Sequence, residues 1–301
     1  MLLTLGLACA HGTAGGPTGG RTIVQIDVVP DFLAAWQEVR NAPRTEQVTR
    51  TRQALLGSHP ELFGPDVFGP VASFDRDLER LLVEMPRLEP KLRALSERMP
   101  GELERSARRF LDEFPELAWS GPVASSLSFS HFESVWRTVG GRRTLVVGLD
   151  AIAFYRGPYA PLEPVIHHAL AAALLPVWKG PGPAPLWWTL WEEAFPLAAV
   201  RTLDPASSDA DLRLTGDGKD PAYLAALARR VRGSLDSTKE TDRRAITGTG
   251  GAVTSGGRWL ALRVGQRVLA GRTLHDAARL EGAQLRTAID AALVAVERPG
   301  S

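Results

Sequence analysis

Cysteine is almost absent from this 301-residue chain, and so is any excess of charge of one sign. The single cysteine, Cys9, excludes an internal disulfide framework and a thiolate zinc site, because both need several sulfur atoms from one chain. Thirty-five basic and 34 acidic side chains leave a formal net charge of +1, with no long block of either sign. We therefore expect no nucleic acid partner, since such binding needs a concentrated basic surface.

Long apolar runs are also missing, so we expect contact with a membrane only through the N-terminus. The apolar run there is short and extends from Leu2 to Ala8, immediately before Cys9. It resembles the end of a bacterial lipoprotein signal, which implies that Cys9 is acylated after cleavage. Residues 12–20 are rich in Gly and Thr, which is typical of a flexible tether. The resemblance predicts an exported protein that is lipid-anchored in the cell envelope; the alternative is an incidental apolar N-terminus.

The rest of the chain, residues 21–298, is expected to form a single domain behind the signal and tether of residues 1–20. Its share of hydrophobic residues, 44%, is enough to bury a substantial core. Apolar patterning predicts strands at 22–28, 123–129 and 144–149. The third is almost entirely apolar and should lie inside a sheet.

Apolar residues at helical spacing predict that helices form most of the remaining chain. These helices are expected at 32–39, 45–56, 102–114, 162–175, 186–203, 221–231, 258–270 and 284–296. Residues 74–98 should form a helical hairpin or a bent helix, because Pro86 and Pro90 each remove a backbone donor. Residues 59–70 contain three Pro-containing turn signals and are expected to be a loop. The expected fold class is α+β, mostly helical with a small sheet.

The residues with a chemical signature lie in the segment Leu162–Ala172 and, further on, in the pair Glu192 and Glu193. Two histidines four residues apart on a helix project from one face and can bind zinc. A glutamate beside the first histidine polarises the bound water, and a later helix adds a carboxylate. This arrangement is the His-Glu-x-x-His motif.

The order of the surrounding segments resembles an uncharacterised bacterial family of predicted zinc-dependent proteases of the gluzincin type. The resemblance lies in Gly148–Ala153, in the tryptophan-rich stretch Pro185–Ala194, in Leu203–Leu212 and in the closing helices. It implies a zincin-like metalloprotease scaffold. In family members with the intact motif it also implies a zinc cofactor and peptidase activity.

This sequence departs from the family pattern at the residues that matter for catalysis. If His168 stands at the first ligand position, Ala169 replaces the glutamate and Ala172 replaces the second histidine. If His167 stands there, His168 replaces the glutamate and Ala171 the second histidine. In both alignments the general base and one ligand are missing, so we expect no catalytic residues.

Glu193 survives at the position of the later carboxylate, 25 residues beyond His168. Consecutive helical residues point about 100° apart, so two adjacent imidazoles cannot easily share one tetrahedral ion. We therefore expect no metal at the vestigial positions His167, His168 and Glu193, and no other cofactor. The expected protein is catalytically inactive and binds or scaffolds an unknown protein or peptide. The rival is an active metal-dependent peptidase, with zinc, in which His131 supplies the missing ligand.

Simpler interpretations of the same residues remain open. One of the two histidines can be a core residue that is hydrogen-bonded to a carbonyl group or to Glu193. Trp187 and Trp191 either pack in the core or, together with His131, line a cleft. In a purely structural protein without a ligand, side chains such as Trp187 and Phe195 would fill that cleft.

Overall fold

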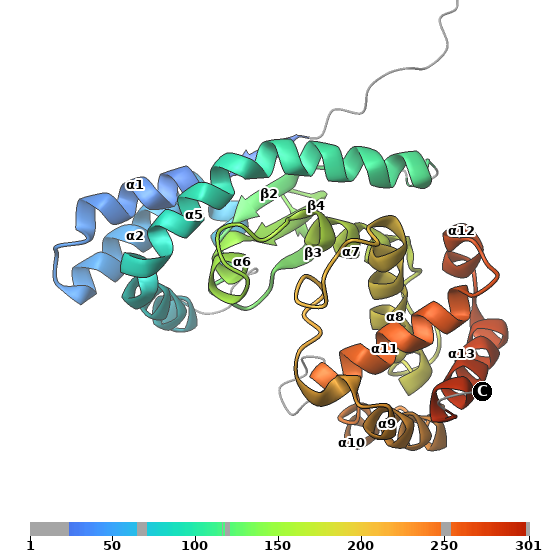
Figure 1. The fold of residues 1–301 in the computed structure, drawn as a ribbon. Coiled ribbons are helices and arrows are strands. Elements are labelled where there is room, and N and C mark those ends of the chain that lie inside the picture. The colour runs from blue at the N-terminus through green and yellow to red at the C-terminus, as the bar shows by residue number, and fades with distance from the viewer. Residues whose placement is uncertain (1–23, 65–70, 116, 118–120, 248–253, 299–301) are drawn as a thin grey trace, which may run out of the picture.

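The computed structural model describes residues 24–64, 71–115, 117, 121–247 and 254–298 (Figure 1). The chain is 64% helical and carries a small four-stranded sheet, which confirms the expected α+β class. The predicted signal and tether, including Cys9, lie outside the described residues. Among the described helices, none combines the length and the apolar character that crossing a bilayer requires.

The sheet has the strand order β1-β2-β4-β3. Its strands are β1 (Gln25–Asp27), β2 (Val123–Ser126), β3 (Ser134–Val139) and β4 (Arg142–Gly148). β1, β2 and β4 are parallel, and β3 lies antiparallel at one edge. Val146 of β4 pairs with Ala124 on one side and with Val135 on the other. The apolar run at 144–149 correctly predicted this inner position, because a strand between two neighbours and under helices is apolar on both faces.

The first half of the chain is dominated by one long helix. Its helices are α1 (Val29–Val39), α2 (Arg44–Ser58), α3 (Pro60–Phe63) and α5 (Val71–Glu113). Figure 1 shows α5 passing over the sheet along much of the molecule. Part of the segment 59–70, which was expected to be a loop, forms the short helix α3. Pro60 occupies its first turn, a position that tolerates proline.

The continuity of α5 corrects two expectations. A hairpin within 74–98 and a separate helix at 102–114 are both wrong, because α5 runs through Pro86, Pro90 and Pro100 without ending. A proline removes one backbone donor, but the stripe of buried side chains continues across each of them. This stripe includes Met85, Leu88, Leu92, Met99 and Leu103. Tertiary burial of the stripe thus outweighs the local cost of the prolines.

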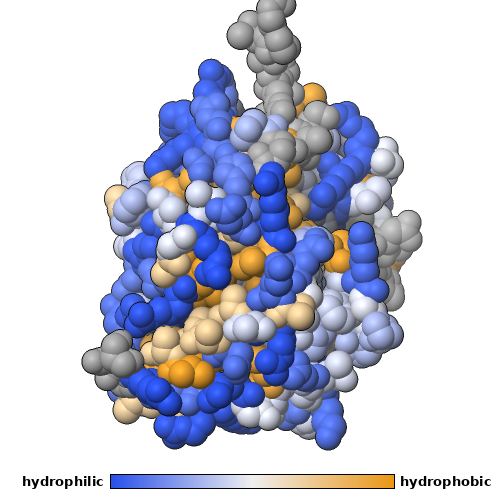
Figure 2. All heavy atoms as spheres, turned by 90° about the vertical axis from the view of Figure 1, so that its right-hand side faces the viewer, coloured by the Kyte–Doolittle hydropathy of each residue, from blue (hydrophilic) through white to orange (hydrophobic). Residues whose placement is uncertain are grey.

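The second half of the chain is a group of helices around α8. Its elements are α6 (Leu149–Tyr155), α7 (Glu163–Leu174), α8 (Leu186–Leu203), the 3₁₀ turn η1 (Gly216–Lys219), α9 (Pro221–Gly233), α10 (Glu240–Arg243), α11 (Ser255–Leu269), α12 (Leu274–Ala278) and α13 (Gly282–Glu297). α8 is mostly buried and packs against α7 and α11. Figure 2 shows the face on the right of Figure 1, which is mostly hydrophilic with a hydrophobic band from its centre to its lower part.

The contact between α8 and α11 depends on a glycine. A Cβ added at Gly265 would lie 2.3 Å from the carbonyl oxygen of Ala194 and 2.8 Å from the Cβ of Ala198. We expect Gly265→Ala to lower the free energy of unfolding by about 1–3 kcal/mol, because the two helices must separate to admit the methyl group. Gly57→Ala in α2 is the control, since nothing lies within 4 Å of its new Cβ. Urea unfolding of both variants tests the packing, and equal stability would contradict it.

Candidate functional site

His167 and His168 occupy α7 and face different surroundings. His167 is fully buried, and its Nε2–H donates to the main-chain oxygen of Ser106 in α5 at 3.0 Å. Burial lowers the pKa of His167, and the acceptor at Ser106 opposes this decrease. The interpretation of one histidine as a core residue bonded to a carbonyl is therefore confirmed for His167. Its ring points into the contact between α7 and α5.

His168 borders a small cavity instead. The cavity has a volume of about 160 Å³ and is lined by Glu133, Ser134, Arg156, Pro164, Val165, His168, Asp211, Leu212, Arg213 and Arg258. The Nε2 atom of His168 is buried and has no hydrogen-bond partner among the described residues. Burial, followed by the positive charges of Arg258 and Arg156, lowers the pKa of His168 to about 3. The imidazole is therefore neutral at physiological pH.

Glu193 of α8, which the sequence analysis aligned with the later carboxylate of the motif, is paired with an arginine of α11. Its Oε1 lies 2.6 Å from Nη1 of Arg258, and the two side chains are only 13% and 18% exposed. This contact is an ion pair without aligned hydrogen-bond geometry, since Oε1 lacks a hydrogen-bond partner among the described residues. Burial raises the pKa of Glu193, and the charge of Arg258 opposes the increase. Arg258 also donates from Nε and Nη2 to the carbonyl oxygen of Leu212, at 3.2 and 3.1 Å.

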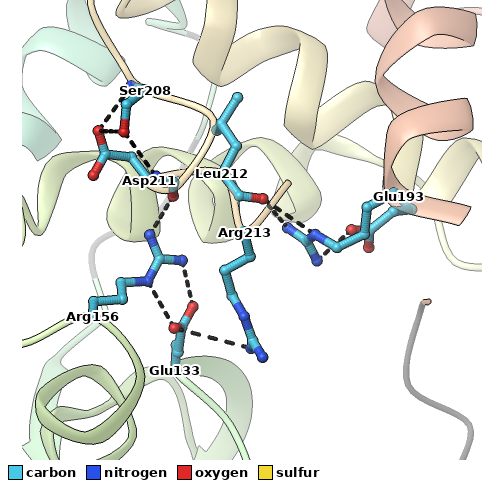
Figure 3. Close-up of polar contacts among 8 residues, drawn as sticks. Glu133, Arg156, Glu193, Ser208, Asp211, Leu212 and Arg213 are labelled. Carbon is cyan, nitrogen blue, oxygen red and sulfur yellow. Dashed lines mark hydrogen bonds and ion pairs between the residues drawn. The ribbon is translucent and has the colours of Figure 1, made fainter. Parts of the chain in front are cut away.

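A second buried pair lies on the other side of the cavity, between Arg156 and Glu133 (Figure 3). Nε and Nη2 of Arg156 donate to the two carboxylate oxygens of Glu133 at 2.7 and 2.6 Å, and both side chains are at most one-tenth exposed. Nη1 of the same arginine donates to the carbonyl oxygen of Asp211. The carboxylate of Asp211 turns away and accepts hydrogen bonds from the main chain and hydroxyl of Ser208.

Arginine side chains thus hold the loop of residues 207–212 in place by hydrogen bonds to its main-chain oxygens. Arg156 binds the carbonyl oxygen of Asp211, Arg258 that of Leu212, and Arg201 that of Ser207. Arg213 follows with a positive φ of 54°, a conformation that residues other than glycine rarely adopt. Three guanidinium groups satisfy main-chain oxygens that would otherwise lack donors, so this loop forms a fixed wall of the site.

The remaining residues of the predicted site lie elsewhere. Nε2 of His131 is 3.0 Å from Oδ2 of Asp77 in α5, and its side chain is 55% exposed. It does not border the cavity. Of the two interpretations of Trp187 and Trp191, packing in the core agrees with the structure: the side chains are 6% and 0% exposed, and neither borders the cavity beside His168. The ring of Trp187 packs against those of Trp178 and Trp188, with centroids 5.7 Å apart in each case.

The structure therefore places Arg258 near both residues: it pairs with Glu193 and borders the same cavity as His168. His131 and His167 have other partners, Asp77 and the main chain of Ser106. Within the described parts of the chain, no group of three or more His, Cys, Asp or Glu side chains is placed to hold a metal ion. Phe195 is buried in the core as the purely structural interpretation requires, but the cavity beside His168 is not filled.

The arginines of the site are the residues that sequence reasoning missed. Arg156 follows the end of α6, Arg213 lies in a loop, and Arg258 is near the start of α11. They meet their partners across 23 to 80 sequence positions, from the pair Arg156–Glu133 to the pair Arg213–Glu133. No local spacing marks such contacts. Basic residues on helical surfaces are also common, so residue type alone could not select these three.

No family model, curated protein or solved structure matches this chain. The class of the protein therefore rests on the fold and on the site described above: an α+β protein in which a small cavity with arginine side chains in its wall lies between the sheet and the C-terminal helices.

Proposed function

We propose that this chain is a catalytically inactive relative of zinc proteases, with a zincin-like scaffold, that acts as a binding or scaffolding protein in the cell envelope. The cavity beside His168 is its retained cleft, and a protein or peptide is its partner. The observation that carries this proposal is the ion pair between Glu193 and Arg258. The position that would ligate zinc in an intact protease here neutralises a side chain of the same protein.

Charge explains why this pairing favours a metal-free cleft. At an effective dielectric constant of about 20, two like unit charges 4 Å apart repel by roughly 4 kcal/mol, and a divalent ion would experience about twice that from one guanidinium. Arg213 adds further repulsion, because its charge also acts on Glu193, whereas the charge of Arg156 is compensated by Glu133. A zinc ion beside Glu193 would have to overcome both effects with one remaining histidine, His168.

The chemistry of peptide hydrolysis also lacks its general base. Ala169 and Ala172 stand where the better alignment of the motif requires a glutamate and a second histidine. An alanine methyl group can neither accept a proton from water nor donate an electron pair to zinc. The rival hydrolase needs His131 as a ligand, and that side chain interacts with Asp77 instead. These observations support the inactive protein over the rival.

The location of the protein is inferred from its N-terminus alone. An acylated Cys9 and the following Gly-rich tether would hold the folded domain at the membrane surface. We accordingly propose contact with the membrane only through this lipid, and no nucleic acid partner. A near-neutral formal charge of +1 supports the second point.

Zinc content is the test of this proposal. We expect the purified protein, dialysed against zinc and then against zinc-free buffer, to retain far less than one zinc ion per chain in elemental analysis. The triple variant Ala169→Glu, Ala172→His and Arg258→Met rebuilds the motif and removes the competing cation, so it should retain one zinc ion if the scaffold is zincin-like.

The matched control carries Ala173→His in place of Ala172→His, which moves the second imidazole about 100° around α7. This control should not retain zinc. A tightly held stoichiometric zinc ion in the unmodified protein would overturn the proposal. Equal zinc retention by the rebuilt and control variants would remove the argument for a zincin-like scaffold.

A further inference from the structure

The cavity beside His168 carries more positive than negative charge. Three cationic side chains border it: Arg156, Arg213 and Arg258. Glu133 is the carboxylate that faces them, because Asp211 directs its own carboxylate away to the preceding turn (Figure 3). Among the charged groups that face the cavity, with the buried Glu193 counted against Arg258, one positive charge remains in excess; the charge of Asp211 lies on the outer side, with Ser208.

Arg213 holds this excess charge. Its Nη1 lies 4.0 Å from Oε1 of Glu133, at the outer limit of an ion pair, and its side chain is 45% exposed. The guanidinium group lies 5.0 Å from the ring centroid of Tyr155. Stacking on an aromatic ring positions the cation without using its N–H donors. Arg213 is therefore held at the cavity with donors that a ligand can use.

His168 offers a second group for a ligand. Its buried Nε2 has no hydrogen-bond partner within the described residues. Such an atom costs roughly 1–3 kcal/mol when it stays unsatisfied, and buried polar atoms normally have partners. Arg258 adds spare donors on the same wall, because within the part of the chain that the structure describes its five N–H groups have only Leu212 and Glu193 as partners.

We propose that this cavity binds a carboxylate group, supplied by the C-terminus of a peptide or by a small organic acid, through Arg213 with the support of His168 and Arg258. The inference rests on the proposed binding role of the cleft. A carboxylate matches the planar guanidinium in shape and can accept two parallel hydrogen bonds from it. Its single negative charge also equals the excess charge of the cavity wall.

Size and surroundings favour this ligand over larger or more highly charged anions. The volume of about 160 Å³ is close to the roughly 150 Å³ of an engineered cavity that holds benzene, so it suits a carboxylate with a few attached carbons. A doubly charged phosphate would be repelled by Glu133. Beside Arg213, the half-exposed rings of Tyr155 and Phe154 pack together at 5.1 Å, which offers apolar surface to the rest of a peptide.

The test is an NMR titration of the whole protein, observed at the ¹⁵N–¹H signals of the arginine Nε groups. The protein is first passed over a chelating resin and its zinc content is measured. Four additions are compared: acetate, the peptide acetyl-Ala-Ala-Ala with a free carboxylate, the same peptide as its C-terminal amide, and inorganic phosphate. We expect the two acids to shift the signals of Arg213 and Arg258, and the amide to leave them unchanged.

Arg213→Gln removes the partly exposed cation without leaving a buried carboxylate unpaired, and it should weaken acid binding about tenfold. Arg108→Gln is the matched control, since Arg108 is 70% exposed on α5 and should not alter binding. Tighter binding of the peptide acid than of acetate identifies a chain terminus as the source, and equal binding identifies a free acid. Equal binding of acid and amide, stronger shifts with inorganic phosphate, or no shift at all would overturn the inference. Zinc in the starting protein would instead overturn the proposed function.

Discussion

Replacing Arg258 with methionine is expected to lower the free energy of unfolding by about 3–5 kcal/mol. The substitution keeps most of the side-chain volume but leaves Glu193 buried without a counter-ion, and an isolated buried charge costs this much. It also removes both donors to the carbonyl oxygen of Leu212. Urea unfolding followed by far-UV circular dichroism measures the loss as a shift of the midpoint.

A double-mutant cycle separates the ion pair from the other effects of the substitution. The double variant Arg258→Met with Glu193→Gln removes both charges, so we expect it to recover at least about 2 kcal/mol relative to the sum of the single variants. An exposed pair of the same type, Arg108 with Glu104, is the control. Arg108→Met should change stability by no more than about 1 kcal/mol. Additive single effects at Arg258 and Glu193 would show that the two side chains do not act as a pair.

This pair also shows which part of the site the sequence could predict. The motif analysis identified Glu193 and the two histidines because their spacing on helices is a local property. The partner of Glu193 could not be found in the same way, because Arg258 comes 65 residues later and meets it only after α11 packs on α8. The departures from the His-Glu-x-x-His pattern at Ala169 and Ala172 were visible in the sequence. The cation beside Glu193 was visible only in three dimensions.

A similar distinction holds for the fold. The boundaries of α8 agree with the expected helix at 186–203 because its sequence is mostly apolar and is bounded by Pro185. β3 was not predicted, since a half-buried edge strand that contains Ser134 and Arg137 shows little alternation. For β3 the local signal was too weak, whereas for the continuous helix α5 a strong local signal was misleading. Its prolines give a strong local signal for a break, and burial of the whole stripe against the rest of the protein overrides that signal.

The loop after β2 illustrates a further kind of information that local patterns do not supply. Phe129 and Ser130 both have positive φ angles, 53° and 64°. Each costs roughly 1–2 kcal/mol for residues other than glycine, so the surrounding structure must hold them in place. Asp150, at the start of α6, provides this restraint. It is fully buried and accepts hydrogen bonds from the main-chain N–H groups of Ser128 and Ser130, at 2.6 and 2.7 Å.

Asp150→Asn should therefore lower the free energy of unfolding by about 2–4 kcal/mol, although the two side chains have almost the same shape. The amide has one acceptor oxygen where the carboxylate has two, so its NH₂ group must face one of the two main-chain N–H donors and leave that donor unsatisfied. Burial raises the pKa of Asp150, and these hydrogen bonds oppose the increase by favouring the charged form. The strained loop carries His131 and leads into β3, and Glu133, which immediately precedes β3, borders the cavity.

Unfolding by urea measures the loss of stability in Asp150→Asn, with Asp112→Asn on the exposed face of α5 as the control. If the two variants are equally stable, Asp150 does not restrain the loop, and the position of Glu133 in the cavity wall must be explained by its pairing with Arg156 alone.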